Sequence, residues 1–292
     1  MNQLLKRMDL AARFMHSSPG GYMGMYLKEQ CRLLEEILKG KPYIGTTFYV
    51  PGEIMAGFDV EAVYLERMAG FGAANGVVKN MTFIKNNGGL PSCSCTYQTL
   101  FDTLIGERII PVPAGFIAAS FACDDAWMYC RNAAWKYNIP FHLIDVVRSE
   151  CDKARAYLAK GIEGIYEGLS TKFETVSSIK EIVDNSNKAI DIKEEIDRLI
   201  IRYPGVMDST DRFKLFPIYN DLGRKYTVDT LFSMLEYIKE KVKSYHVPKV
   251  PRILWLGVLP LYRNRIITDI EKTYGCRIVF EELFDYPYVK IN

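Results

Sequence analysis

The sequence predicts an α/β protein in which a parallel sheet is covered by helices on both faces. Residues 42–147 alternate short apolar runs with stretches of helical periodicity, which is the pattern of strand–helix–strand units. The composition, with 49% hydrophobic and 25% charged residues, is typical of a folded globular protein. At 292 residues, the chain is long enough for two domains.

The first 40 residues predict two helices. Apolar side chains recur at helical spacing over residues 4–15, and the pattern returns over residues 25–38. Residues 19–21, a proline followed by two glycines, separate the two stretches because proline and glycine are poor helix residues. We therefore expect an N-terminal helical segment at residues 1–40.

Residues 41–148 form the predicted first α/β domain. Its strands are indicated by apolar and β-branched runs, and its helices by amphipathic stretches that follow turn residues. The expected strands are residues 42–48, 60–65, 108–112 and 140–147, and the expected helices are residues 52–58, 97–105 and 126–137. Residues 70–89 are rich in glycine and asparagine, so we expect a loop there.

The rest of the chain divides into two further parts. Residues 149–247 mix charged and apolar residues at helical spacing, which predicts a mainly helical region. Residues 248–292 predict a buried strand at 252–257, a helix at 265–274 and a strand at 277–280. Two strands need more sheet beside them, so we expect 248–292 to be a second, incomplete α/β domain.

Charge and hydropathy argue against several classes of protein. The chain carries 37 basic and 35 acidic residues, and its net charge of +2 gives no indication of binding to nucleic acid or to an anionic membrane. No run of about 18 uncharged apolar residues occurs, and the N-terminus lacks the apolar core of a signal peptide. With seven cysteines, an odd number, we expect a cytoplasmic protein whose thiols are reduced.

Three cysteines are candidate metal ligands. Cys93 and Cys95 directly precede one predicted helix, and Cys123 precedes another. A helix N-terminus stabilises a thiolate, and the turns that lead into helices gather at one edge of a parallel sheet. Iron–sulfur clusters require thiolates, whereas zinc sites usually have cysteines at the CxxC spacing, which is absent. This pattern favours an iron–sulfur cluster over zinc.

The alternative, which applies to all seven positions, is that the cysteines fill the core, since free cysteine is among the most buried residue types. We expect this of Cys31, Cys151 and Cys276, which lie in helical or strand patterns with no partner nearby. Cys130, seven residues and about two helical turns beyond Cys123, is a lesser metal candidate. His142 lies in an apolar strand, so we expect a core residue rather than a ligand.

Glu53 is the candidate catalytic acid or base. It follows Pro51 at the start of a predicted helix, beside the end of the first strand. A carboxylate there has two interpretations, a catalytic group or a partner of the helix dipole. The sequence contains no Walker loop, no GxGxxG after a strand and no GxSxG elbow, so nucleotide hydrolysis and serine-hydrolase chemistry have no direct support.

Several short motifs also occur in a particular order along the chain. They are Gly40–Gly45, Phe48–Gly57 with Tyr49-Val50-Pro51-Gly52-Glu53 at its centre, Cys95–Leu100, Cys123-Asp124, Arg252–Gly257 and Ile270–Gly275. As an ordered set they resemble the 2-hydroxyacyl-CoA dehydratase and benzoyl-CoA reductase family, in particular its 2-hydroxyglutaryl-CoA dehydratase D-component. The resemblance spans roughly residues 35–290.

This resemblance implies two flavodoxin-like α/β domains with a [4Fe-4S] cluster held by three cysteines. By position, Cys123 matches the second family cysteine, Cys93 or Cys95 matches the first, and Glu53 lies near the substrate site. It also implies an acyl-CoA substrate, a second dehydratase subunit and a separate ATP-dependent iron–sulfur activator. One electron from the activator makes a ketyl radical at the thioester carbonyl, which lets hydroxide leave, the chemistry of a lyase.

One departure from the family keeps alternatives open. The family's third cysteine lies in the far part of the second domain, and we expect the chain to stop before that part. Three functions are then compatible with the motifs: an iron–sulfur subunit, a cluster-free partner or assembly protein of the same fold, and a double-cluster reductase of small molecules. The doublet of Cys93 and Cys95 is the feature that suggests the third.

Overall fold

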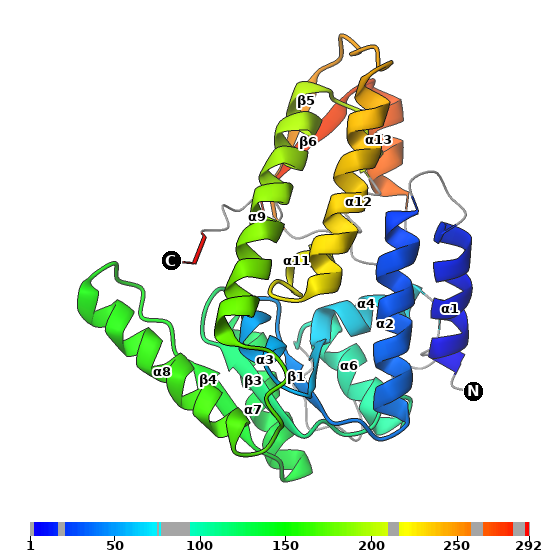
Figure 1. The fold of residues 1–292 in the computed structure, drawn as a ribbon. Helices are drawn as coiled ribbons and strands as arrows, with labels where there is room; N and C mark the ends of the chain where they lie inside the picture. Colours follow the sequence, from blue (N-terminus) through cyan, green and yellow to red (C-terminus); the bar gives the residue numbers. More distant parts are fainter. Residues whose placement is uncertain are drawn as a thin grey trace. The chain divides into compact units, whose positions relative to one another are not determined.

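The computed structural model describes residues 3–16, 21–74, 76, 94–209, 216–257, 265–282 and 290–291. The chain forms two compact units, each described here by itself (Figure 1). Unit 1 contains Met1–Asp9 and Gln30–Ile179, and unit 2 contains Leu10–Glu29 and Lys180–Asn292. The domain division expected from the sequence, with boundaries after residues 40, 148 and 247, stays a prediction.

Unit 1 is built on a four-stranded parallel sheet. Its strands are β1 Tyr43–Thr46, β2 Glu61–Tyr64, β3 Gly115–Ala119 and β4 Phe141–Ile144. They pair in the order β2-β1-β3-β4, and Gly45 of β1 lies opposite Val63 on one side and Phe116 on the other. This is the strand order of flavodoxin-like sheets, so the predicted fold class is confirmed.

Helices cover both faces of this sheet. They are α3 Glu53–Ala56, α4 Leu65–Ala74, α6 Thr96–Gly106, α7 Asp124–Tyr137 and α8 Asp152–Ser170. On one face, Ile44 and Ile117 pack with Leu169 of α8. On the other, the Phe116 ring meets the Tyr129 ring of α7 edge-on, with centroids 6.2 Å apart. Coverage from both sides explains why every residue of β1 and β3 is buried.

The predicted strand at residues 108–112 is wrong. Helix α6 is followed by a turn in which Arg108 has a φ of 56°, and β3 begins only at Gly115. Pro111 and Pro113 have no backbone N–H to donate, which disfavours strand pairing in this stretch. The β-branched run is therefore irregular chain, and the strand forms after it.

The predicted loop at residues 70–89 is wrong over its first part. Residues 70–74 complete α4, which packs along α6, with Gly72 beside the Leu104 side chain. This contact between helices outweighs the low helix propensity of the glycines in the segment. Apart from Gly76, the rest of the predicted loop lies outside the described residues.

The two helices predicted at the N-terminus are confirmed as α1 Gln3–His16 and α2 Tyr22–Leu38. Each is divided between the units: residues up to Asp9 and from Gln30 belong to unit 1, and the residues between them belong to unit 2. Sequence periodicity shows that these helices have apolar faces, but it does not show which core each face joins.

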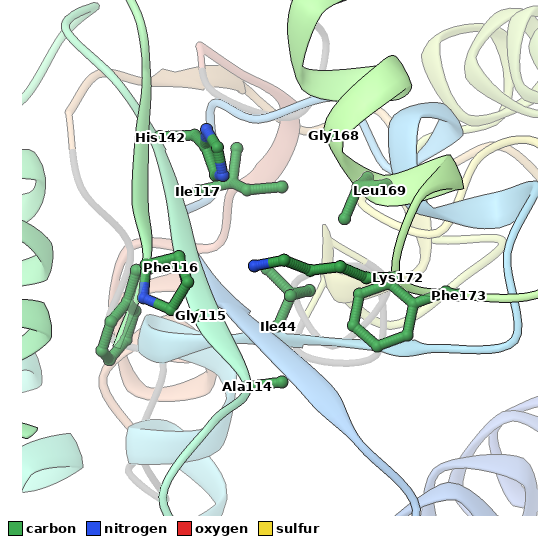
Figure 2. Close-up of a pocket in the computed structure, with 11 residues that line it drawn as sticks. Ile44, Ala114, Gly115, Phe116, Ile117, His142, Gly168, Leu169, Lys172 and Phe173 are labelled. Atoms are coloured by element: carbon green, nitrogen blue, oxygen red, sulfur yellow. The ribbon is translucent and has the colours of Figure 1, made fainter. Parts of the chain in front are cut away.

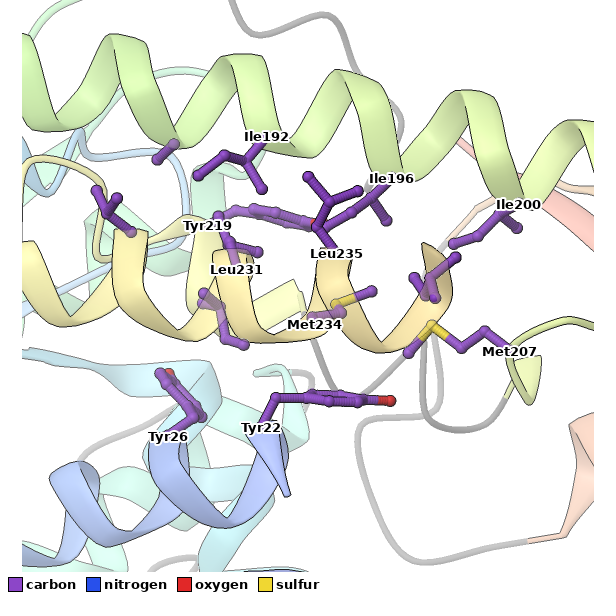
Figure 3. Close-up of a cluster of buried hydrophobic side chains, with 14 of the residues drawn as sticks. Tyr22, Tyr26, Ile192, Ile196, Ile200, Met207, Tyr219, Leu231, Met234 and Leu235 are labelled. Carbon is purple, nitrogen blue, oxygen red and sulfur yellow. The ribbon is translucent and has the colours of Figure 1, made fainter. Parts of the chain in front are cut away.

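The core of unit 2 lies between two long helices, α9 Ile179–Arg202 and α12 Lys225–Val242, with the short helix α11 Phe216–Tyr219 between them in the chain. Figure 3 shows buried side chains of this core, which include Tyr22, Tyr26, Ile192, Ile196, Ile200, Tyr219, Leu231 and Leu235. The Tyr26 hydroxyl donates to the Asp221 carboxylate at 3.3 Å. No helix within the described ranges combines the length and the apolar character needed to cross a membrane.

Unit 2 also contains the predicted strand–helix–strand unit, as β5 Arg252–Trp255, α13 Ile266–Tyr274 and β6 Arg277–Glu281. The two strands are parallel and pair with each other. The prediction that β5 is buried is wrong, because Leu254 is 51% exposed. Among the described residues no third strand joins this pair, and a two-stranded sheet covers little of its own surface.

Candidate functional site

The candidate site lies at the carboxyl edge of the four-stranded sheet. In a parallel sheet, the helices that connect the strands run antiparallel to them. The N-termini of these helices therefore lie at the edge where the strands end. Helix α4 follows β2, α7 follows β3, and α6 packs beside α4. The N-termini of these three helices carry Glu66, Cys95 and Cys123.

Cys95 is the residue that precedes α6, in the N-cap position. It is half-buried, and its backbone N–H donates to the Asp125 carboxylate at 2.7 Å. Asp125 lies in the first turn of α7, so this bond joins the N-termini of two helices. The predicted convergence of the two turns in space therefore has a direct physical link.

Cys123 occupies the N-cap position of α7 and is also half-buried. Burial raises the pKa of its thiol, the charges of Glu66, Cys95 and Asp125 raise it further, and a hydrogen bond from the Ala126 backbone opposes them. The helix N-terminus thus favours the thiolate as expected, but burial and negative neighbours outweigh it. The pKa of Cys123 in the metal-free chain is therefore above that of an ordinary thiol.

The turn that leads into Cys123 is strained. Ala122 has a φ of 65°, in the left-handed region that residues with a side chain rarely adopt. The Cys123 N–H donates to the Phe121 carbonyl at 2.9 Å and closes this turn tightly. The Phe121 ring packs edge-on against Tyr49, from the turn after β1, with centroids 5.8 Å apart. Strained backbone of this kind is found preferentially at functional sites.

Glu66 is a residue that the sequence argument missed. It lies in the first turn of α4 and is buried, and burial raises the pKa of its carboxyl group to about 7, although its own backbone and that of Phe48 hydrogen bond to it. Within the described part of the chain, its Oε2 atom has no hydrogen-bond partner. The available signal was its position: an acidic residue directly after a strand, at the edge where the cysteines were expected.

Glu53, the predicted acid or base, is the first residue of α3 and is half-buried. The short helix follows the turn after β1, so Glu53 belongs to the same edge of the sheet. The groups whose charges act on Cys123 are Glu66, Cys95 and Asp125. The catalytic assignment of Glu53 stays a prediction.

The other cysteines divide clearly by burial. Cys31 and Cys276 are buried as expected, and so is Cys130, whose thiol pKa is raised by burial. The prediction that Cys151 belongs to the core is wrong: it is exposed at the N-cap of α8, and a hydrogen bond from Ser149, with further ones from backbone N–H groups, lowers its pKa. Cys93 lies outside the described residues.

In the parts of the chain that the structure describes, no group of three or more His, Cys, Asp or Glu residues is arranged to hold a metal ion. Two of the three predicted ligands, Cys95 and Cys123, come close enough for their charges to interact. The described residues therefore provide a pair of thiols at the sheet edge, with carboxyl groups of Glu66 and Asp125 beside them.

A small cavity lies elsewhere in unit 1, near the beginnings of β3 and β4 (Figure 2). Its volume of about 20 Å³ suits a water molecule, and most of its lining is apolar. His142 and Lys172 also line it, and burial followed by the Lys172 charge lowers the pKa of His142. The cavity is too small for an acyl-CoA and lies at the opposite ends of the strands from the cysteines.

Comparison with known families gave a match over most of the chain. The sequence model of a family described as 2-hydroxyglutaryl-CoA dehydratase, D-component, matches residues 47–290. The match begins at the turn after β1 and covers Cys95, Cys123 and the strand–helix–strand unit of unit 2. A search of curated proteins found no match.

Proposed function

We propose that this chain, which belongs to the 2-hydroxyglutaryl-CoA dehydratase D-component family, is an iron–sulfur subunit. The enzyme would be a 2-hydroxyacyl-CoA dehydratase or a related acyl-CoA reductase. The observation that carries the proposal is the joining of two helix N-termini, each with a cysteine at its cap, by the bond from Cys95 to Asp125. The substrate class, an acyl-CoA thioester, follows from the family.

The donor set agrees with iron–sulfur ligation in its chemistry. Cys95 and Cys123 are thiol donors at one sheet edge, and thiolates are the ligands that such clusters require. Thiols lose their protons when they bind a metal, and the raised pKa of Cys123 opposes this loss, so cluster uptake is favoured as pH rises. Cys93, which lies outside the described residues, is the remaining proposed ligand of the same site.

A [4Fe-4S] cluster bound by these thiolates would supply one electron at a time to the thioester. The chain's own residues have other roles. Asp125 holds the Cys95 backbone, and the exposed rings of Tyr49 and Phe121 form an apolar surface next to Cys123. Glu53 is the proposed acid or base that moves a proton at the substrate, since α3 follows the strand end at this edge.

Three partners belong to the proposal. They are the acyl-CoA substrate, a second dehydratase subunit and an ATP-dependent iron–sulfur activator that delivers the electron. The proposal also gives the protein a lyase activity shared with its partner subunit and a cytoplasmic location, where cysteines stay reduced. Neither nucleic acid nor a membrane is part of it.

One observation favours the second candidate, a cluster-free partner or assembly protein of the same fold. Burial raises the pKa of the Cys123 thiol, which disfavours the thiolate that a cluster requires. A protein of this kind would keep the sheet and the helices of unit 1 without iron. The two candidates differ in whether the purified chain contains iron and sulfide.

The test is anaerobic purification followed by determination of iron and acid-labile sulfide. We expect the wild-type chain to be brown and to contain both. Cys95→Ser and Cys123→Ser should each lose most of the iron, while Cys151→Ser, which changes another N-cap cysteine in unit 1, should keep it. A colourless wild-type chain without iron, or full iron content in Cys95→Ser and Cys123→Ser, would overturn the proposal.

A further inference from the structure

Helices α6 and α7 are joined by a second polar contact, far from their N-termini. Asp102 of α6 is 3% exposed, and it accepts hydrogen bonds from three residues of α7. The donors are Lys136 Nζ at 3.1 Å, the Tyr137 hydroxyl at 3.3 Å and the Tyr129 hydroxyl at 3.4 Å. One buried carboxylate therefore holds one helix against several points of the other.

The two helices do not need this carboxylate for apolar packing. Phe101 of α6 already meets Tyr129 of α7 edge-on, with ring centroids 6.4 Å apart. A buried charge is costly compared with an apolar side chain of similar volume, even when it is paired. What a satisfied buried network does provide is one defined arrangement of the elements that it joins.

The cysteines lie at the other end of the same pair of helices. Cys95 precedes α6 and Cys123 precedes α7, and the Cys95 N–H bond to Asp125 closes the gap between them. Asp102 follows Cys95 by seven residues, so it fixes α6 about two turns further along. Polar contacts at two levels therefore join α6 to α7.

We propose that Asp102 and Asp125 are positioning residues that set the separation of the Cys95 and Cys123 sulfur atoms. The inference rests on the proposed function, which assigns both sulfurs to one cluster. Ligands of a metal site have to be held within about 0.5 Å of their productive geometry, and a helix bound at one end only does not provide this. The contacts of Asp102 with α7 and of Asp125 with the Cys95 N–H are present in the metal-free chain, so the proposal is testable without a cluster.

The experiment measures the rate at which dibromobimane, a reagent that becomes fluorescent when it bridges two thiols, cross-links Cys95 to Cys123 in the full-length metal-free chain. A Cys93→Ser background and peptide mapping identify the bridge. Asp102→Asn removes the charge that pairs with Lys136, and Asp125→Ala removes the acceptor of the Cys95 N–H. We expect each to lower the cross-linking rate at least fivefold relative to the rate at which monobromobimane modifies the same cysteines. The ratio is needed because loss of the Asp125 charge also lowers the pKa of Cys123 and so speeds its alkylation.

Each variant has a matched control. Asp124→Ala also removes a carboxylate from the first turn of α7, but Asp124 contacts Trp127 of the same helix. Glu61→Gln removes another buried carboxylate of unit 1, the one that pairs with Lys41 at 2.9 Å, without touching α6 or α7. We expect both controls to cross-link within twofold of the parent, whatever their melting temperatures.

The outcomes separate this inference from the proposed function. Unchanged cross-linking in Asp102→Asn and Asp125→Ala, or an equal loss in the two controls, overturns the inference. If Asp102→Asn does not fold, Asp125→Ala and Tyr137→Phe, which removes one hydroxyl from the network, decide the same question. A wild-type chain that takes up no iron while the two variants cross-link slowly overturns the proposed function alone.

Discussion

Three helices of unit 1 begin with a cysteine, yet the three thiols differ. Cys95 and Cys123 cap α6 and α7, are half-buried and interact through their charges, whereas Cys151 caps α8 and is fully exposed. The pKa of Cys123 is raised by burial and by acidic neighbours such as Glu66, while that of Cys151 is lowered by hydrogen bonds. The same N-cap position is therefore found with a raised thiol pKa at Cys123 and a lowered one at Cys151.

The comparison shows what an N-cap position does and does not determine. Backbone N–H groups favour the thiolate at both Cys123 and Cys151. Only at Cys123 do burial and negative charge outweigh them, and these depend on which helices pack together. A candidate ligand site is therefore defined by the convergence of α6 and α7 and not by the cap itself.

The first test of the difference between Cys123 and Cys151 changes Glu66, because the charge of Glu66 raises the pKa of Cys123. Its folded pKa of about 7 exceeds the ordinary 4.5, so its stabilising contribution is complete below pH 4.5 and is lost as pH rises through 7. Glu66→Gln does not titrate, so it should gain on wild type over this window by up to roughly 3 kcal/mol in the free energy of unfolding. Denaturant unfolding at several pH values measures the gain.

Glu36→Gln is the control for this prediction, and its expected change in stability relative to wild type has the opposite sign. Burial is the largest single influence on Glu36 and favours its neutral form, but the hydrogen bonds and charges of Lys41 and Arg32 together outweigh it and lower its pKa. Its contribution is present at neutral pH and is lost as pH falls, so Glu36→Gln should lose stability relative to wild type at neutral pH. If the stability of Glu66→Gln follows wild type in parallel from pH 4 to pH 8, burial is the wrong explanation for the raised pKa of Glu66.

A smaller effect is expected at the turn that precedes Cys123. Ala122 has a left-handed φ of 65°, which glycine adopts without strain, and no residue of the turn before Cys151 has a positive φ. Ala122→Gly should therefore raise the free energy of unfolding by about 0.5 kcal/mol, after the entropy that glycine adds to the unfolded chain. Thermal unfolding followed by circular dichroism is sensitive enough to detect this change.

Ala133→Gly, inside α7, is the reference for that measurement. Ala133 is buried in regular helix, so glycine there should cost about 1 kcal/mol or more. A loss of stability in Ala122→Gly as large as the loss in Ala133→Gly would mean that the turn before Cys123 is not strained. The asymmetry between the two cysteine turns would then rest on burial and charge alone.

Much of the fold follows from sequence patterns, because those patterns arise from local periodicity. The apolar run at residues 42–48 became β1, and the amphipathic stretch at 97–105 became α6 with nearly the same bounds. The strand expected at 108–112 failed, since prolines nearby remove the donors that a ladder needs. The burial of β5 failed as well, because burial depends on neighbours that the sequence of one strand does not reveal.

The candidate site was predicted only in outline. That the turns of Cys95 and Cys123 would lie at one edge followed from parallel topology, and the hydrogen bond from the Cys95 N–H to Asp125 agrees with it. The exposure of Cys151 and the buried carboxyl of Glu66 were not foreseen, since both depend on which surfaces α8 and α4 present after packing. Pairwise contacts such as that of Asp102 with Lys136 likewise arise between helices that are separate in sequence.

The most direct test of the central claim is differential alkylation of the chain before and after anaerobic cluster loading, read by mass spectrometry of its peptides. If Cys95 and Cys123 hold the cluster, loading should lower their rates of reaction with iodoacetamide at least tenfold, while exposed Cys151 reacts at the same rate in both forms. Equal rates for Cys95 and Cys123 in the loaded and metal-free chains would contradict the account.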